Sequence, residues 1–209
     1  MEKRLYRIVE NHFKDQHVLV TKTNTGIKGG QVDVVIVKAV FSDLLNDCEV
    51  ISIEVKSSTE NFLKSLGQTL GYSIFSDRCY LAARGDFTNN EISIADKLGV
   101  GLIRIKGRKC ETVASSKLFK PLEYMKLKLL NKLNIHRCVI CRSYFILDDY
   151  SEKIQNAIKQ KRNFVYWLFE QDSLAYEKGL EDRKLTYKRR YVCKDCIEGF
   201  VSKLMSSTQ

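Results

Sequence analysis

Two carboxylates and a lysine stand in segments whose other residues are mostly apolar and β-branched. Asp33 lies in the run 31–37, and Glu54 and Lys56 lie in the run 49–57. Burying an unpaired charge is costly, so such groups persist where they pair with each other or bind a metal ion. Mg²⁺ is commonly held by one or two carboxylates together with substrate phosphate. These three side chains are therefore candidates for a Mg²⁺ or Mn²⁺ centre.

Strand alternation decides whether the three groups can meet. Successive side chains of a strand point to opposite faces, so Glu54 and Lys56 share one face. If their segment pairs as a hairpin with the preceding one, Asp33 can lie beside them. A metal ion there would polarise a phosphoryl oxygen and lower the pKa of a bound water, and the lysine would orient that water or stabilise charge on phosphorus. The alternative is that Glu54 and Lys56 form a solvated strand face and that Asp33 ends a turn.

The segments around these residues predict an α/β protein. Thr59 is the expected N-cap of the second helix, and Gly99 is expected to end the third. The order helix, three strands, helix, strand, helix, strand indicates a mixed central β-sheet flanked by helices. The expected elements are a helix at 2–13, strands at 17–22, 31–37 and 49–57, a helix at 59–75, a strand at 78–83, a helix at 90–98 and a strand at 100–105.

The single proline, Pro121, marks the start of a second pattern. Proline suits the first turn of a helix, so a helix is expected at 122–133. A further helical stretch is expected at 151–171. We therefore predict two domains, an α/β domain over residues 1–115 and a small, mainly helical domain over residues 116–209.

Four of the seven cysteines form two CxxC pairs, Cys138 with Cys141 and Cys193 with Cys196. Structural sites bind Zn²⁺ through four thiolates in a tetrahedron, so the four cysteines predict a structural zinc ion. The odd total, without a signal-peptide pattern, argues against a disulfide framework and for a reducing compartment, the cytoplasm. The alternatives are buried thiols or redox motifs, and His136 is an alternative ligand.

The net charge of +10 and the pI of about 9.2 favour an acidic partner, of which a nucleic acid is the commonest. The cluster Lys188, Arg189 and Arg190 is the predicted DNA contact. Lys28, in the glycine-rich segment 25–30, could approach a phosphate, although a plain connector is the favoured interpretation of that segment. The aromatic residues among the basic residues of 159–169 are expected to be mostly core. No apolar run is long enough to span a bilayer, so no membrane association is expected.

The strand motifs resemble the PD-(D/E)xK nuclease superfamily, in particular its Holliday-junction-resolvase-like and exonuclease-like branches. The resemblance rests on Asp33-Val34-Val35-Ile36, on Ile53-Glu54-Val55-Lys56 and on Gln68 in the following helix, and it covers roughly residues 1–107. It implies a restriction-endonuclease-like core in which Asp33 and Glu54 ligate the metal and Lys56 is the catalytic lysine. Val32 stands where a proline is common in the family.

The resemblance also implies two further site residues. Gln68 would position the water or a ligand, and Tyr72, four residues on, could share its helix face or be a core aromatic. An acidic residue on the first helix is expected to be Glu2, with Glu10 as the alternative.

The predicted activity is metal-dependent hydrolysis of DNA phosphodiesters, and junctions, flaps and ends are the candidate substrates. A single centre cuts one strand, so symmetric cutting would favour a homodimer. Two other functions stay open at this point. One is a catalytically inactive nucleic-acid-binding protein of the same fold, and the other is a zinc-stabilised interaction or regulatory protein.

Overall fold

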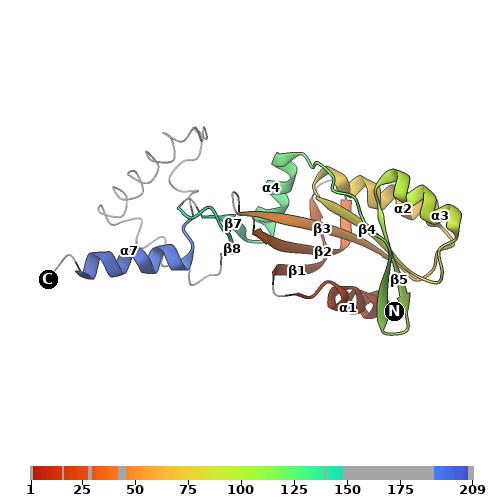
Figure 1. The fold of residues 1–209 in the computed structure, drawn as a ribbon, viewed down its shortest axis with the longest axis horizontal. Coiled ribbons are helices and arrows are strands. Elements are labelled where there is room, and N and C mark those ends of the chain that lie inside the picture. The colour runs from red at the N-terminus through yellow and green to blue at the C-terminus, as the bar shows by residue number, and fades with distance from the viewer. Residues whose placement is uncertain are drawn as a thin grey trace. The chain divides into compact units, whose positions relative to one another are not determined.

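A six-stranded mixed β-sheet carries the candidate residues (Figure 1). Its strands are in the order β1-β2-β3-β4-β5-β6. Strand β1 is antiparallel to β2. Strands β3, β4 and β5 are parallel to one another, and β6 is antiparallel to β5. The strands are β1 (Val18–Ile27), β2 (Gly30–Phe41), β3 (Asn46–Lys56), β4 (Arg78–Arg84), β5 (Gly101–Lys106) and β6 (Lys109–Ala114). The α/β class with a mixed sheet is confirmed.

The structure is a computed structural model of the 209-residue chain. By its contacts the chain divides into two units, Met1–Phe41 with Asp47–Leu133, and Ser42–Asn46 with Asn134–Gln209. The residues that the structure describes are 2–15, 17–27, 30–41, 46–138, 140–147 and 191–206.

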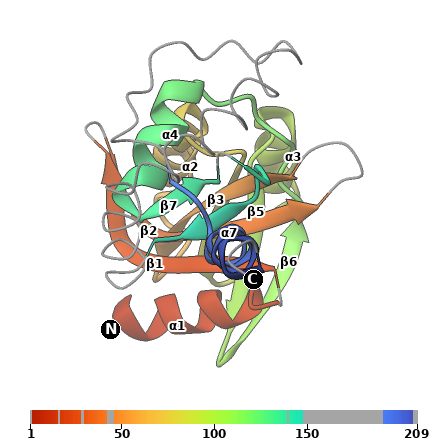
Figure 2. The same ribbon diagram turned by 90° about the vertical axis from the view of Figure 1, so that its left-hand side faces the viewer.

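Helices cover both faces of the sheet in the first unit (Figure 2). On one face, Leu5 and Val9 of α1 (Glu2–His12) pack on a cluster that includes Ile53. The helices on the other face are α2 (Phe62–Gly71), the short 3-10 helix η1 (Tyr72–Ile74), α3 (Asn89–Leu98) and α4 (Glu123–Lys132). Burial of apolar side chains on both faces of β3 to β5 fixes these strands firmly.

Local sequence predicted the end of α3 correctly but not the start of α2. Thr88 and Glu91 form a capping box at the start of α3, and Gly99, at φ +76°, ends it as expected. The prediction of Thr59 as a cap was wrong. The second helix begins at Phe62, and Asn61 at its N-cap makes no capping hydrogen bond through its side chain.

Strand β6 was not predicted from the sequence. Gly107, at φ +60°, and the residue after it form a two-residue turn between Lys106 and Lys109, which pair across the hairpin. This strand lies at the edge of the sheet, and its side chains are exposed or half-buried. It therefore lacks the apolar signal that marks β3 to β5.

Helix α4 belongs to the first unit, whereas the predicted boundary between residues 115 and 116 precedes it. Polar contacts hold it there. The Lys126 ammonium lies 2.8 Å from Asp77 Oδ2, and the Lys132 ammonium donates to the Gly26 carbonyl at 2.6 Å. Both side chains of the Lys126–Asp77 pair are largely buried, so the unit extends to residue 133.

The described part of the second unit is small. It contains a two-stranded antiparallel sheet of β7 (Ile135–Arg137) and β8 (Tyr144–Ile146), and the helix α7 (Lys194–Ser206). Cys138, Val192, Cys193 and Ile197 form its buried cluster. The helix predicted at 151–171 lies outside the described residues.

Candidate active site and cysteine cluster

Asp33 is held between α1 and β3. Its Oδ1 accepts a hydrogen bond from the Tyr6 hydroxyl at 3.0 Å, and its Oδ2 accepts one from the backbone amide of Val55 at 2.8 Å. The Val55 amide therefore donates to a side chain of the neighbouring strand β2. The carboxylate is half-buried and oriented by two donors, neither of which carries a charge.

Glu54 is the most deeply buried ionisable group of the site, with 1% of its surface exposed. Its Oε1 accepts from the Lys56 ammonium at 2.5 Å, and its Oε2 accepts from the Tyr72 hydroxyl at 2.6 Å. Burial raises the pKa of Glu54, the bonds from Lys56 and Tyr72 lower it, and the charge of Asp33 raises it; the net change is upward. The two carboxylates thus lie near enough to repel each other.

Tyr72 links this centre to the start of β2. Its hydroxyl lies 2.6 Å from Glu54 Oε2 and 2.9 Å from the Gln31 carbonyl, and it accepts from the Gln68 amide at 3.1 Å. Because a phenol has one hydrogen, Glu54 and the Gln31 carbonyl share or alternate as its acceptor. Burial, together with the hydrogen bond to Glu54, raises the pKa of Tyr72 far above its usual range, so the phenol stays neutral.

Three further residues were predicted for the site, Gln68, Glu2 and Glu10, and they differ in how they relate to the two carboxylates. Gln68 is exposed on α2, and its amide donates to Tyr72, so it reaches the carboxylates through that hydroxyl. Glu2 is the first residue of α1, and its side chain lies outside the described part. Glu10 lines a cleft together with Tyr6, the residue that donates to Asp33.

Tyr6 was not predicted from the sequence as a site residue. For Tyr72, the sequence left undecided whether it shares the helix face of Gln68 or is a core aromatic. The only local signal was the spacing of four between Gln68 and Tyr72, which puts both on one helix face. Nothing local connects Tyr6 to Asp33, which is 27 residues away. Both contacts depend on how helices dock on the sheet.

The charges of the centre suit a divalent cation. Two carboxylates and the Lys56 ammonium leave one net negative charge when all three are ionised. The Lys56 side chain is 36% exposed, so it can turn to solvent and free Glu54 Oε1. Oxygen donors from two neighbouring strands are the ligand type that Mg²⁺ and Mn²⁺ accept.

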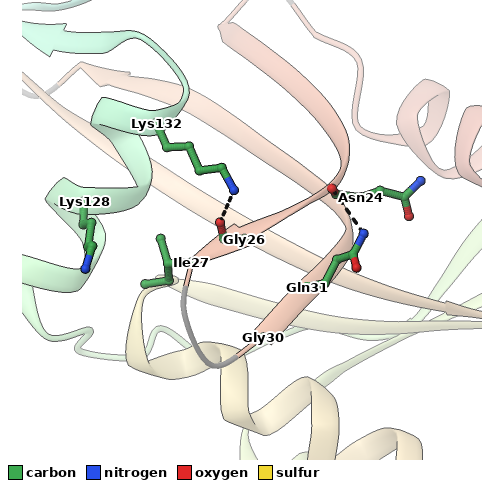
Figure 3. A pocket seen from close by; sticks show the side chains of 7 residues that line it. All are labelled: Asn24, Gly26, Ile27, Gly30, Gln31, Lys128 and Lys132. Carbon is green, nitrogen blue, oxygen red and sulfur yellow. Dashed lines mark hydrogen bonds between the residues drawn. The ribbon is translucent and has the colours of Figure 1, made fainter.

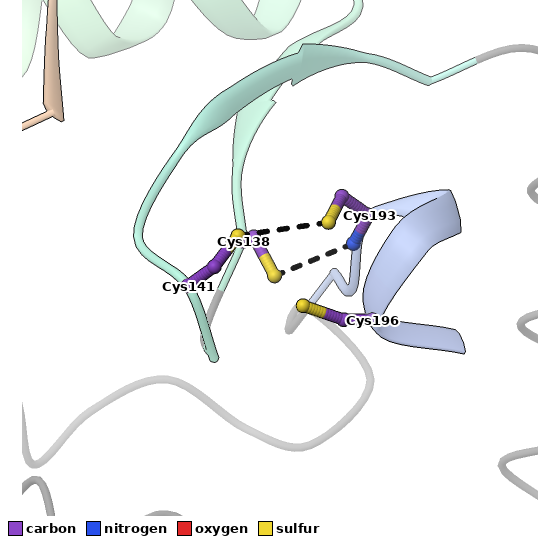
Figure 4. A group of neighbouring side chains, drawn as sticks. All are labelled: Cys138, Cys141, Cys193 and Cys196. Atoms are coloured by element: carbon purple, nitrogen blue, oxygen red, sulfur yellow. Dashed lines mark hydrogen bonds between the residues drawn. The ribbon is translucent and has the colours of Figure 1, made fainter. Parts of the chain in front are cut away.

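The two CxxC pairs come together in the second unit (Figure 4). The sulfur atoms of Cys138, Cys141, Cys193 and Cys196 all lie within 4.8 Å of one another. The first pair lies at the turn between β7 and β8, and the second lies at the start of α7.

Burial and hydrogen bonds act unequally on the thiols of the cluster: the pKa of Cys141 is lowered, whereas burial raises the pKa of Cys193 to about 11 and also raises that of Cys196. The Cys193 amide donates to Cys138 Sγ at 3.4 Å, and the sulfur atoms of Cys141 and Cys193 are 3.6 Å apart. Burial raises the pKa of Cys141, but hydrogen bonds from Ser143 and neighbouring thiols outweigh it and bring the pKa down to about 7. His136 is not part of the cluster; its ring lies against Tyr191, with the centroids 4.0 Å apart.

The predicted DNA contacts Lys28, Lys188, Arg189 and Arg190 lie outside the described residues, as do the aromatic residues of 159–169. Within the described ranges, no helix is both long and apolar enough to cross a membrane.

Comparison with known proteins assigns neither a family nor an activity. No protein-family model matches the chain, and no curated protein matches it. One matching solved structure is the SPO1766 protein of unknown function from Silicibacter pomeroyi. It is 23% identical, the match covers 63% of this chain and 82% of that one, and the TM-score is 0.46.

Proposed function

We propose that the chain is a Mg²⁺- or Mn²⁺-dependent deoxyribonuclease of the PD-(D/E)xK type, with a structural zinc ion in its second unit. The observation that carries the proposal is the state of Glu54. A carboxylate buried to 1% exposure, beside a second carboxylate and a lysine, is a costly arrangement that cation binding would relieve. Carboxyl groups whose pKa is shifted by burial and by neighbouring charges cluster at functional sites.

Each residue has a role that follows from its contacts. Asp33 and Glu54 would hold the cation, which supplies a polarised phosphoryl oxygen and an acidified water. Tyr6 and Tyr72 fix the orientation of these carboxylates through their hydroxyls. Lys56, freed from Glu54, would donate to the attacking water or to a phosphate oxygen as negative charge develops there.

The zinc part of the proposal rests on the spacing of the thiols. Four thiolates at about 2.3 Å from Zn²⁺ in a tetrahedron are about 3.8 Å apart. The observed cluster, with all sulfur atoms within 4.8 Å and one pair at 3.6 Å, fits that geometry.

A cleavage assay on labelled single strands, duplexes, flaps and junctions, with Mg²⁺ or Mn²⁺, tests the proposal. We expect Lys56→Ala to lower the cleavage rate by about a hundredfold or more. Lys97→Ala removes an exposed lysine of α3 and is the matched control, with no expected change.

Two results would contradict the site assignment. Cleavage that survives in both Asp33→Asn and Glu54→Gln would place the centre elsewhere. A wild-type protein that binds DNA but is inert with both metals on every substrate would be a non-catalytic binding protein of the same fold. A homodimer would support paired cuts in both strands, which sedimentation of the protein with junction DNA can detect.

A further inference from the structure

Two clefts lie next to the tyrosines that hold the carboxylates of the candidate active site, one beside Tyr72 and one beside Tyr6. The first has a volume of about 510 Å³ and lies between the end of the β1–β2 hairpin and α4 (Figure 3). The second, of about 540 Å³, lies between α1 and β1. Asn24 of β1, at φ +49°, lines both, so the clefts meet at this residue.

The first cleft is connected to Glu54 through Tyr72. Gly30 lines the cleft, and a methyl group at that position would come within 3.3 Å of the Tyr72 ring, so the ring lies against the bare backbone. The Tyr72 hydroxyl also contacts the Gln31 carbonyl and Glu54. The second cleft is connected to Asp33 in the same way, because Tyr6 lines it and donates to Asp33.

Both clefts are lined by basic side chains. Figure 3 shows Lys128 and Lys132 one turn apart on α4, beside the hairpin end. Both are exposed, and neither forms an ion pair with a carboxylate in the part of the chain that the structure describes; Lys132 donates to the Gly26 carbonyl. Arg4 and Arg7, both exposed, line the second cleft, which also contains Glu10.

We infer that these two clefts form one phosphate-binding track for a nucleic-acid strand, with Lys128 and Lys132 contacting phosphates on one side of the centre and Arg4 and Arg7 on the other. Either cleft alone has the size of a small-ligand pocket. Cationic groups on both sides of a phosphodiester-cleaving centre, however, suit an extended polyanion that crosses it. The inference rests on the proposed function and deepens it, since it assigns the surface that positions the substrate.

The salt dependence of DNA binding shows how much the loss of two phosphate contacts should change the affinity. Each phosphate contact contributes about 0.9 to the slope of log affinity against log salt for a duplex, so losing two contacts lowers the slope by about 1.8. Those two contacts alone account for roughly a 12-fold fall in affinity between about 50 and 200 mM salt.

The experiment measures fluorescence anisotropy of a labelled duplex against the full chain, without added Mg²⁺ or Mn²⁺, across that salt range. We expect the double variant Lys128→Gln, Lys132→Gln to show the reduced slope. Replacing both lysines by arginine should keep the wild-type slope. The control is Arg108→Gln with Lys109→Gln, which removes two exposed charges near the β5–β6 turn, at the other edge of the sheet, and should leave the slope unchanged.

A wild-type slope in the lysine-to-glutamine variant, or no DNA binding by the wild type, overturns the track. Failure of the two proposals can be told apart with the cleavage assay. A reduced slope without any cleavage by the wild type supports the track and refutes the nuclease. Cleavage by the wild type with an unchanged slope in the variant refutes the track alone.

Discussion

Replacing Glu54 by glutamine should make the protein more stable and inactive at the same time. The pKa of Glu54 is raised by burial, so the folded state holds this proton more tightly than the unfolded chain does. By linkage, the contribution of Glu54 to stability is fullest below its unfolded pKa and is lost as the pH rises through the raised folded value. At pH 8, above the unfolded pKa, burial of Glu54 therefore destabilises the protein in the absence of added cation, and glutamine removes that cost.

The hydrogen bonds of the site show that glutamine leaves no polar group without a partner. Its oxygen can accept from Lys56, and its amide can donate to the Tyr72 oxygen. Tyr72 can then turn its own hydrogen to the Gln31 carbonyl, 2.9 Å away. Lys56 is already one-third exposed, so it can return to water. We expect a gain of about 1–2 kcal/mol at pH 8, the lower part of the range for removing buried ion pairs.

Thermal unfolding of the full chain measures this gain as a rise in Tm of about 2–4 °C for each kcal/mol. The difference from wild type should shrink as the pH is lowered toward 4.5, because a protonated Glu54 is as neutral as glutamine. Added Mg²⁺ should stabilise the wild type but not the variant. Glu60→Gln, an exposed residue before α2, is the control and should change neither property.

A loss of about 3 kcal/mol or more in Glu54→Gln at pH 8 would refute the reasoning, because that is the cost of breaking a buried ion pair that stabilises the fold. Glu54 would then stabilise the fold, and the two carboxylates would not be a cation site that is unfavourable without its cation.

Three further predictions concern the Tyr72 hydroxyl, the cysteine cluster and the close packing around Gly101. Tyr72→Phe removes a hydrogen bond to a charged group, worth about 1.5–3 kcal/mol, so cleavage at pH 7 should fall about tenfold or more and the acid limb of the pH–rate profile should move to higher pH. Cys193→Ser should abolish the zinc content measured by mass spectrometry, whereas Cys110→Ser, outside the cluster, should keep it. Gly101→Ala would press a methyl group into a tyrosine ring of β4 and should cost about 1–3 kcal/mol in the free energy of unfolding. The matched change Gly67→Ala, at an open position of α2, should instead gain about 0.5–1 kcal/mol.

The strands that carry the candidate residues were predictable because their signal is local. The alternation in β3 puts Ile53 and Val55 on one face and Glu54 on the other, and the structure has Ile53 and Val55 in the α1-facing core. A buried strand with apolar residues on one face and an acid on the other is visible in the sequence before any tertiary contact is known.

The tyrosines that hold the two carboxylates were not predictable as their partners, because Tyr6 is 27 residues from Asp33 and Tyr72 is 18 residues from Glu54. The Lys126–Asp77 pair spans 49 residues, and it joins α4 to the sheet together with the buried Leu129 and Leu130. Composition after Pro121 gave no hint of this, since α4 is only weakly amphipathic and much of its surface is exposed. The boundary of the first unit is therefore a property of packing.

The two tyrosines explain how the carboxylates can be both ordered and available. An arginine beside each would fix its orientation equally well, but it would also neutralise the charge that attracts a cation. A tyrosine hydroxyl donates the same kind of hydrogen bond without adding charge, and Tyr6 and Tyr72 each occupy one oxygen of their carboxylate. Among the described contacts of the two carboxylates, Lys56 is the one cation, and it is partly solvated. The proposed cation site depends on this remaining negative charge, because a divalent cation would exchange with Lys56 there.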